Sequence, residues 1–163
     1  MAAGPENAAS RSGACPGEST AGSADRLARF VDAQLGVYEQ ALAELLAGRK
    51  RTHWMWFVFP QLKGLGRSPT SRYYGLESVA EARLYLDHAL LGERLRQCTA
   101  ALLSHRGKSV ETMLGAIDAV KLRSSMTLFD SAGGESGLFG ECLAAFFGGA
   151  RDPDTLRLLD QAL

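Results

Sequence analysis

The sequence has no surplus of charge of either sign. Its 163 residues carry 18 Lys and Arg against 18 Asp and Glu, so the formal net charge at pH 7 is zero. A protein held to nucleic acid mainly through the phosphates needs a basic surplus. We therefore expect no DNA binding, although a local basic patch is compatible with this balance.

Cysteines and metal-binding motifs are scarce. The three cysteines, Cys15, Cys98 and Cys142, are odd in number and far apart, which excludes a disulfide framework and a CxxC metal site. The three histidines are scattered, and the sequence has no GxSxG, HExxH or EF-hand motif. The sequence therefore predicts no metal and no cofactor.

Long apolar runs are also missing. None reaches the ~18 residues that a membrane span needs, and the N-terminal region lacks the apolar core of a signal peptide. We expect a cytoplasmic protein without membrane contact.

Residues 1–24 are rich in Ala, Gly, Ser and Pro, and we expect them to form a disordered tail. Residues 25–163 have the length of a single domain.

Helical periodicity dominates this domain. Ser78 and Glu81 have the spacing of a capping box, and Asp152 before Pro153 is typical of a helix start. The apolar block at residues 54–59 fits either a buried strand or a short buried helix, because six residues are too few to separate the two. We predict a mainly α fold: a compact bundle of six to eight short helices with at most one small strand element.

The loop at residues 61–72, QLKGLGRSPTSR, is the first candidate binding site. Its glycines permit backbone conformations that aim N–H groups into one concavity, and its cations and hydroxyls suit a phosphate or carboxylate. The loop matches neither a Walker motif nor a GxGxxG fingerprint, and an ordinary solvent-exposed turn is the competing interpretation. The ligand-binding candidates in this loop are Gln61, Lys63, Gly64, Gly66, Arg67, Ser68 and Arg72.

An aromatic block precedes this loop. Trp54 and Trp56 have rings that could stack on a base or sugar face, although such runs also form hydrophobic core. Both interpretations stay open for these two ligand-binding candidates. His53 is a candidate acid or base because histidine titrates near neutrality.

The second candidate site is the segment DAVKLRSSMTLF at residues 118–129. On a helix, Lys121, Ser124 and Ser125 share one side, while Val120 is expected to face the core. Hydroxyls in a helix interior are locally unfavourable, which is typical of functional or strained sites, but they also permit close helix packing. The ligand-binding candidates here are Lys121, Arg123, Ser124 and Ser125, and the acidic candidates for catalysis are Asp118 and Glu81.

Four stretches of the chain resemble one family. HWMWFVFPQLKGLGRS at residues 53–68, EARLYL at 81–86, KLRSSMTLF at 121–129 and FFGGARDPDTLRLL at 146–159 are similar to the bacterial family called domain of unknown function 1810. Some of its members carry the label "calpastatin", but this sequence has no repeat that supports protease inhibition. The resemblance implies a small, mainly helical domain and carries no activity with it.

Both candidate segments lie in the stretches that carry the resemblance. If they meet in space, they form a pocket for a phosphorylated or nucleotide-like small molecule. If the protein is an enzyme, we expect a hydrolase or glycosidase that acts on such a metabolite. The alternatives are a non-catalytic protein-interaction module, whose partner the sequence does not identify, and a purely structural helical domain.

Overall fold

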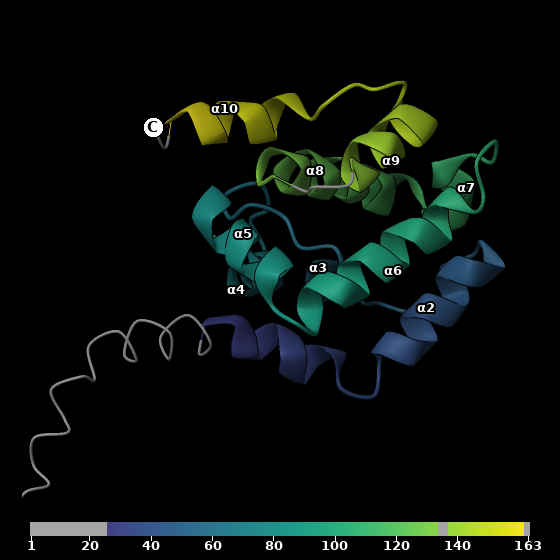
Figure 1. The fold of residues 1–163 in the computed structure, drawn as a ribbon, viewed down its shortest axis with the longest axis horizontal. Helices are drawn as coiled ribbons and strands as arrows, with labels where there is room; N and C mark the ends of the chain where they lie inside the picture. The colour runs from purple at the N-terminus through teal and green to yellow at the C-terminus, as the bar shows by residue number, and fades with distance from the viewer. Residues whose placement is uncertain (1–25, 134–136, 162–163) are drawn as a thin grey trace, which may run out of the picture.

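The computed structural model describes residues 26–133 and 137–161 (Figure 1). These residues form ten helices and no strand, and seven of the helices have seven residues or more, which confirms the predicted mainly α fold. The predicted tail at residues 1–24 lies outside the described residues. The helices span residues 26–34, then α2 (Tyr38–Ala47), α3 (Met55–Val58), α4 (Pro69–Tyr74), α5 (Val79–Asp87), α6 (Leu91–Leu103), α7 (Val110–Leu114), α8 (Ala116–Ser131), α9 (Leu138–Phe147) and α10 (Pro153–Gln161).

The central helix is α8, which packs against α5, α7, α9 and α10 (Figure 1). Its middle turns are buried on every side: six consecutive residues, 124–129, are buried. The hydroxyls of Ser124 and Thr127 donate hydrogen bonds back to the carbonyls of Val120 and Arg123, at 3.2 and 2.8 Å. Small side chains that satisfy their own polar atoms in this way allow neighbouring helices to pack closely.

The ambiguous aromatic block forms a short helix, α3. Trp54, Met55, Val58 and Phe59 are buried, whereas Trp56 is half-buried, which is the pattern of a helix with one face turned outward. The small strand element that the sequence left open amounts to one isolated parallel bridge between residues 62 and 76, which links the loop after α3 to the segment before α5.

Helix starts follow the predicted signals. The Ser78 hydroxyl accepts a hydrogen bond from the backbone N–H of Glu81 at 3.2 Å. The Asp152 carboxylate accepts one from the backbone N–H of Thr155 at 2.9 Å, with Pro153 as the first residue of α10. The caps at Ser78 and Asp152 are therefore confirmed, although the Glu81 carboxylate accepts from the backbone N–H of Glu77 and not from that of Ser78, which a capping box would use.

A buried carboxylate, Glu44 on α2, holds the turn that leads into α3. Its two oxygens accept hydrogen bonds from the backbone N–H groups of Arg51 and Thr52, the Thr52 hydroxyl, the Gln40 amide and the indole N–H of Trp54, all at 2.7–3.0 Å. Burial alone would raise the pKa of Glu44, but the hydrogen bonds outweigh it and hold the pKa well below its usual range. Glu44 is therefore a charged anchor inside the fold.

Two negative findings bear on function. Within residues 26–133 and 137–161, no helix combines the length and apolar character that a membrane crossing requires. The same residues contain no group of three His, Cys, Asp or Glu side chains placed to hold a metal ion.

Cys98 and Cys142 are buried, and burial raises the pKa of each thiol to about 12, so both are inert core residues.

Replacing Glu44 with alanine should lower the free energy of unfolding by about 3 kcal/mol, because several buried donors, including the Trp54 indole, lose their acceptor. Urea denaturation followed by tryptophan fluorescence measures the change.

The matched control is Glu39→Ala, since Glu39 lies on the same helix and is exposed. It should change stability by no more than about 0.5 kcal/mol. Equal losses for the two variants would contradict the role assigned to Glu44.

Candidate functional site

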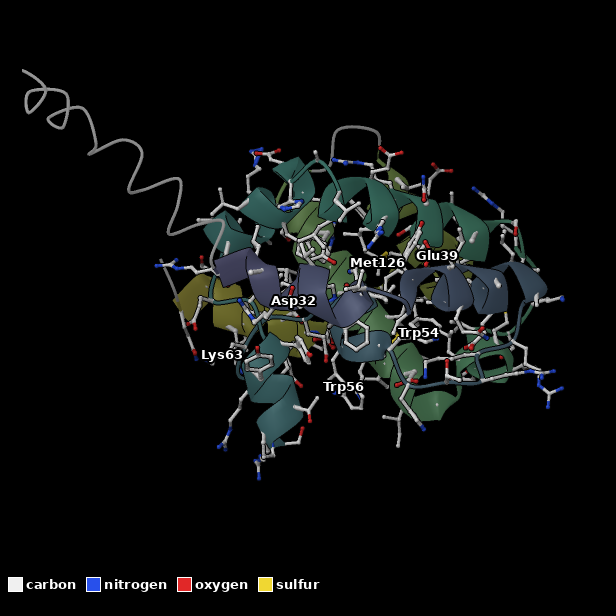
Figure 2. The ribbon with its side chains drawn as sticks, turned by 90° about the horizontal axis from the view of Figure 1, so that it is seen from below. Asp32, Glu39, Trp54, Trp56, Lys63 and Met126 are labelled. Atoms are coloured by element: carbon white, nitrogen blue, oxygen red, sulfur yellow. The ribbon has the colours of Figure 1, made fainter. Side chains whose placement is uncertain are left out.

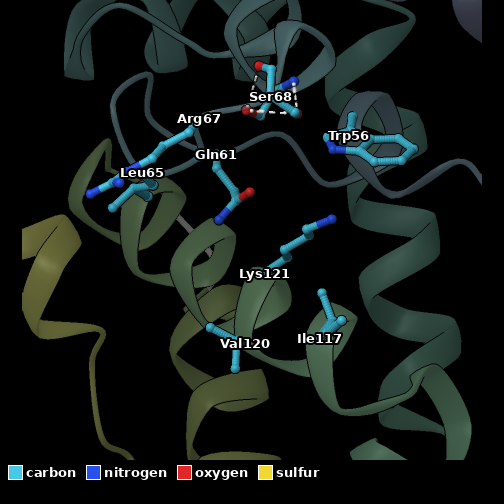
Figure 3. Close-up of a pocket in the computed structure, with 10 residues that line it drawn as sticks. Trp56, Gln61, Leu65, Arg67, Ser68, Ile117, Val120 and Lys121 are labelled. Atoms are coloured by element: carbon cyan, nitrogen blue, oxygen red, sulfur yellow. Dashed lines mark hydrogen bonds between the residues drawn. The ribbon is translucent and has the colours of Figure 1, made fainter.

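The two candidate segments meet at one cleft of about 450 Å³ (Figure 3). One side comes from α3 and the loop that follows it, and the other from the first turns of α8. The cleft is lined by Trp56, Gln61, Leu65, Gly66, Arg67, Ser68, Ser71, Ile117, Val120 and Lys121.

Gly66 allows the loop to pack closely against the first turn of α4 at this cleft. A Cβ at Gly66 would lie 2.5 Å from the Ser71 hydroxyl oxygen, so any larger residue would push the loop away from α4. Ser68 caps α4 by accepting a hydrogen bond from the Ser71 N–H at 3.1 Å. These contacts place Arg67 at the rim of the cleft.

A chain of charges and aromatic rings lies behind the cleft. Asp118 pairs with Lys50 at 2.9 Å and with Lys121 at 3.7 Å. The Lys50 ammonium lies 5.1 Å from the ring centroid of Trp54, and the Lys121 ammonium lies 4.5 Å from that of Trp56, where cations are attracted to the π face. Two lysines share one carboxylate, so the group keeps a net positive charge next to the cleft.

Two polar side chains of the cleft, Arg67 and Gln61, form no ion pair or side-chain hydrogen bond with a described residue. Within the described part of the chain, Arg67 forms no ion pair, and no side-chain hydrogen bond involves Arg67 or the Gln61 amide. Figure 3 shows Gln61 between the loop and α8, with Lys121 extended toward Trp56. The cleft therefore presents three groups to a ligand: the guanidinium of Arg67, which has no ion pair among the described residues, the ammonium of Lys121, which shares Asp118 with Lys50, and the amide of Gln61.

The model of the family described as "Protein of unknown function (DUF1810)" matches residues 24–159. The chain belongs to the DUF1810 family. The resemblance of its four stretches is thus confirmed. The crystal structure of the conserved hypothetical protein Rv1873 from Mycobacterium tuberculosis is similar to it, with 51% sequence identity, a TM-score of 0.80, and coverage of 82% of this chain and 96% of that one. A comparison with curated proteins gave no match.

Among the residues of this DUF1810 chain that the sequence singled out, one group lies together in the cleft. These residues come from both candidate segments, and they are Trp56, Gln61, Gly66, Arg67, Ser68 and Lys121. Their role in binding stays a prediction.

A second group is committed to the fold. Trp54 is fully buried and its indole N–H donates a hydrogen bond to Glu44, so of the two tryptophans only Trp56 lines the cleft. Ser124 and Ser125 are buried inside α8. Arg123 donates hydrogen bonds to the carbonyls of residues 150 and 151, at 3.0 and 2.8 Å, and so holds the segment before α10.

A third group lies around the cleft without lining it. Gly64 has a φ of 105° and faces Leu158. His53 is exposed and lines an aromatic hollow that shares Trp56 with the cleft. Asp118 is engaged by the two lysines. Lys63, Arg72 and Glu81 line another hollow together.

Several residues of the site were not identified from sequence. Val120 was expected in the core, but its side chain is 60% exposed, because α7 and α9 cover other faces of α8 and the first turns form the cleft wall. Ile117, one turn earlier, is 74% exposed. Lys50 was missed because nothing in its sequence neighbourhood signals a partner on α8.

Double-mutant cycles should give a coupling of about 2 kcal/mol for Lys50 with Asp118 and below about 1 kcal/mol for Lys121 with Asp118. The first pair is shorter, and the Lys50 side chain is only 8% exposed against 23% for Lys121. Urea denaturation of Lys50→Met, Lys121→Met, Asp118→Asn and the two double variants provides the measurement.

The exposed pair Arg157–Asp154 is the control and should show a coupling within about 0.5 kcal/mol of zero. The predicted difference between the two coupling energies is refuted if Lys121 couples to Asp118 as strongly as Lys50 does.

Proposed function

We propose that this chain binds an anionic, nucleotide-like small molecule in the cleft between the loop and α8. The observation that carries the proposal is that Arg67 and Lys121, from two distant segments, both line this cleft. A volume of about 450 Å³ is in the range of small-molecule sites.

The charges support an anionic ligand. Arg67 forms no ion pair with a described residue, and Lys121 shares Asp118 with the closer Lys50. Phosphate or carboxylate oxygens would complete the charge balance of both cations, and charge-assisted hydrogen bonds of this kind are among the stronger polar contacts. The Gln61 amide adds donors and an acceptor beside them.

The apolar part of the cleft supports a ligand larger than a simple anion. Four apolar side chains, those of Trp56, Leu65, Ile117 and Val120, line the cleft together with the polar groups. A planar ring packs well on such a surface while its phosphate meets the cations. This combination favours a nucleotide-like molecule over inorganic phosphate.

The chemistry of the lining favours binding over catalysis. Among the described residues that line the cleft, there is no carboxylate, imidazole or thiol to act as a general acid or base. A hydrolase or glycosidase reaction would have to recruit Asp118, which two lysines hold in ion pairs. Binding is therefore the central part of the proposal.

One observation favours a second candidate, a protein-interaction module. Ile117 and Val120 are exposed large apolar side chains one helical turn apart on α8. Exposed apolar clusters at a cleft rim are typical of partner sites. In this version a peptide carboxylate or acidic side chain would meet Arg67 and Lys121.

Calorimetric titration with adenosine monophosphate tests the small-molecule proposal. Replacing Lys121 with methionine or Arg67 with glutamine should weaken the affinity about tenfold each, because each removes one charge-assisted contact while the melting temperature stays nearly unchanged.

Lys108→Gln is the matched control, since it removes an exposed cation outside the cleft and should leave the affinity unchanged. Equal affinities for all three variants and the wild type would refute the site. Failure of the wild type to bind adenosine monophosphate, pyrophosphate and phosphate would favour the interaction module.

A further inference from the structure

A second hollow, of about 540 Å³, lies between the helix of residues 26–34, α4 and the start of α5. It shares no lining residue with the central cleft, and Figure 2 shows Lys63 and Trp56, one from each, at separate positions. Its lining is mostly charged: Arg26, Arg29, Lys63, Arg72, Tyr73, Gly75, Glu77 and Glu81.

A buried carboxylate with an unused oxygen forms part of this hollow. Glu81 is only 2% exposed. Its Oε1 accepts a hydrogen bond from the backbone N–H of Glu77 at 2.7 Å and lies 3.9 Å from the Arg29 guanidinium. Its Oε2 is buried and has no hydrogen-bond partner among the described residues. A buried acceptor without a donor is unfavourable, so a ligand that supplies the donor would gain from this atom.

The cations of the hollow outnumber its carboxylates. Arg29 is held in place because it donates hydrogen bonds to the carbonyls of Tyr73 and Gly75, at 2.7 and 3.1 Å. Arg26 and Arg72 form no ion pair with any residue that the structure describes, and Lys63 pairs with Glu77 at 2.9 Å on the exposed side. Four cations face two carboxylates, so the hollow suits an anion, and its fixed guanidinium reduces the cost of ordering on binding.

We propose that this hollow is a second binding site, specific for a small hydroxylated anion such as a sugar phosphate. The phosphate group meets Arg26 and Arg72, and a hydroxyl of the same molecule donates a hydrogen bond to Oε2 of Glu81 once a small movement of that side chain brings the oxygen to the surface of the hollow. A hydroxyl fits better than an ammonium as the donor, because the surplus of cations repels a positive group. The proposal is independent of the ligand assigned to the central cleft.

Amide NMR spectra of the full chain, titrated with glucose-6-phosphate and separately with inorganic phosphate, test this site. Glucose-6-phosphate should shift the signals of Gly75, Glu77 and Glu81 and should bind at least about fivefold more tightly than phosphate, because only the sugar phosphate supplies a hydroxyl to Glu81. Equal affinities for the two ligands, or shifts confined to Gly66 and Ser71 of the central cleft, would overturn the proposal.

Two variants separate the parts of the site. Arg72→Gln should weaken both ligands, since Arg72 meets the phosphate. Glu81→Gln keeps an acceptor for the Glu77 N–H but loses the charged free oxygen, so it should abolish the fivefold preference for the sugar phosphate. Lys108→Gln serves as the surface control and should change neither affinity. A preference for the sugar phosphate that persists in Glu81→Gln refutes the role of Glu81. If this variant does not fold, the affinities of the wild type for glucose-6-phosphate and for phosphate still decide whether the site prefers a hydroxylated anion.

Discussion

The carboxylate of Glu44 is the interaction on which the arrangement of this molecule depends. It accepts hydrogen bonds from the backbone of residues 51 and 52 and from the Trp54 indole, and so fixes the turn that leads into α3. Trp54 is held inside as the residue before α3, with a non-helical backbone, whereas Trp56 lies in the first turn of α3 and is half-buried. Trp56 therefore reaches the cleft, and the same turn places Lys50 against Asp118 on α8.

The loop after α3 separates two environments of different chemistry. The central cleft combines apolar side chains with Arg67 and Lys121, whereas the second hollow is lined mostly by charged residues, among them Glu81 with its unused oxygen. The bridge between residues 62 and 76 sets this division, because it fixes Lys63 on one side of the loop. Cations close together in sequence thus contribute to different sites.

Sequence motifs predicted the features of the fold whose interacting groups lie close together in the chain. The caps at Ser78 and Asp152 were predictable because their donors lie three residues away. The separation of Trp54 from Trp56 was not, since an unbroken apolar run has no periodicity that indicates which ring is buried. Glu44 was missed because most of its donors lie seven to ten residues farther along the chain. Val120 was assigned to the core because hydropathy does not show which face of α8 its neighbours leave uncovered.

A crystal structure of the protein with adenosine monophosphate tests most directly whether the cleft between the loop and α8 binds a nucleotide. We expect the phosphate to lie between Arg67 and Lys121 and the ring to lie against the apolar side chains that include Trp56. A nucleotide bound at another surface, with the cleft between the loop and α8 empty at saturating ligand, would contradict it.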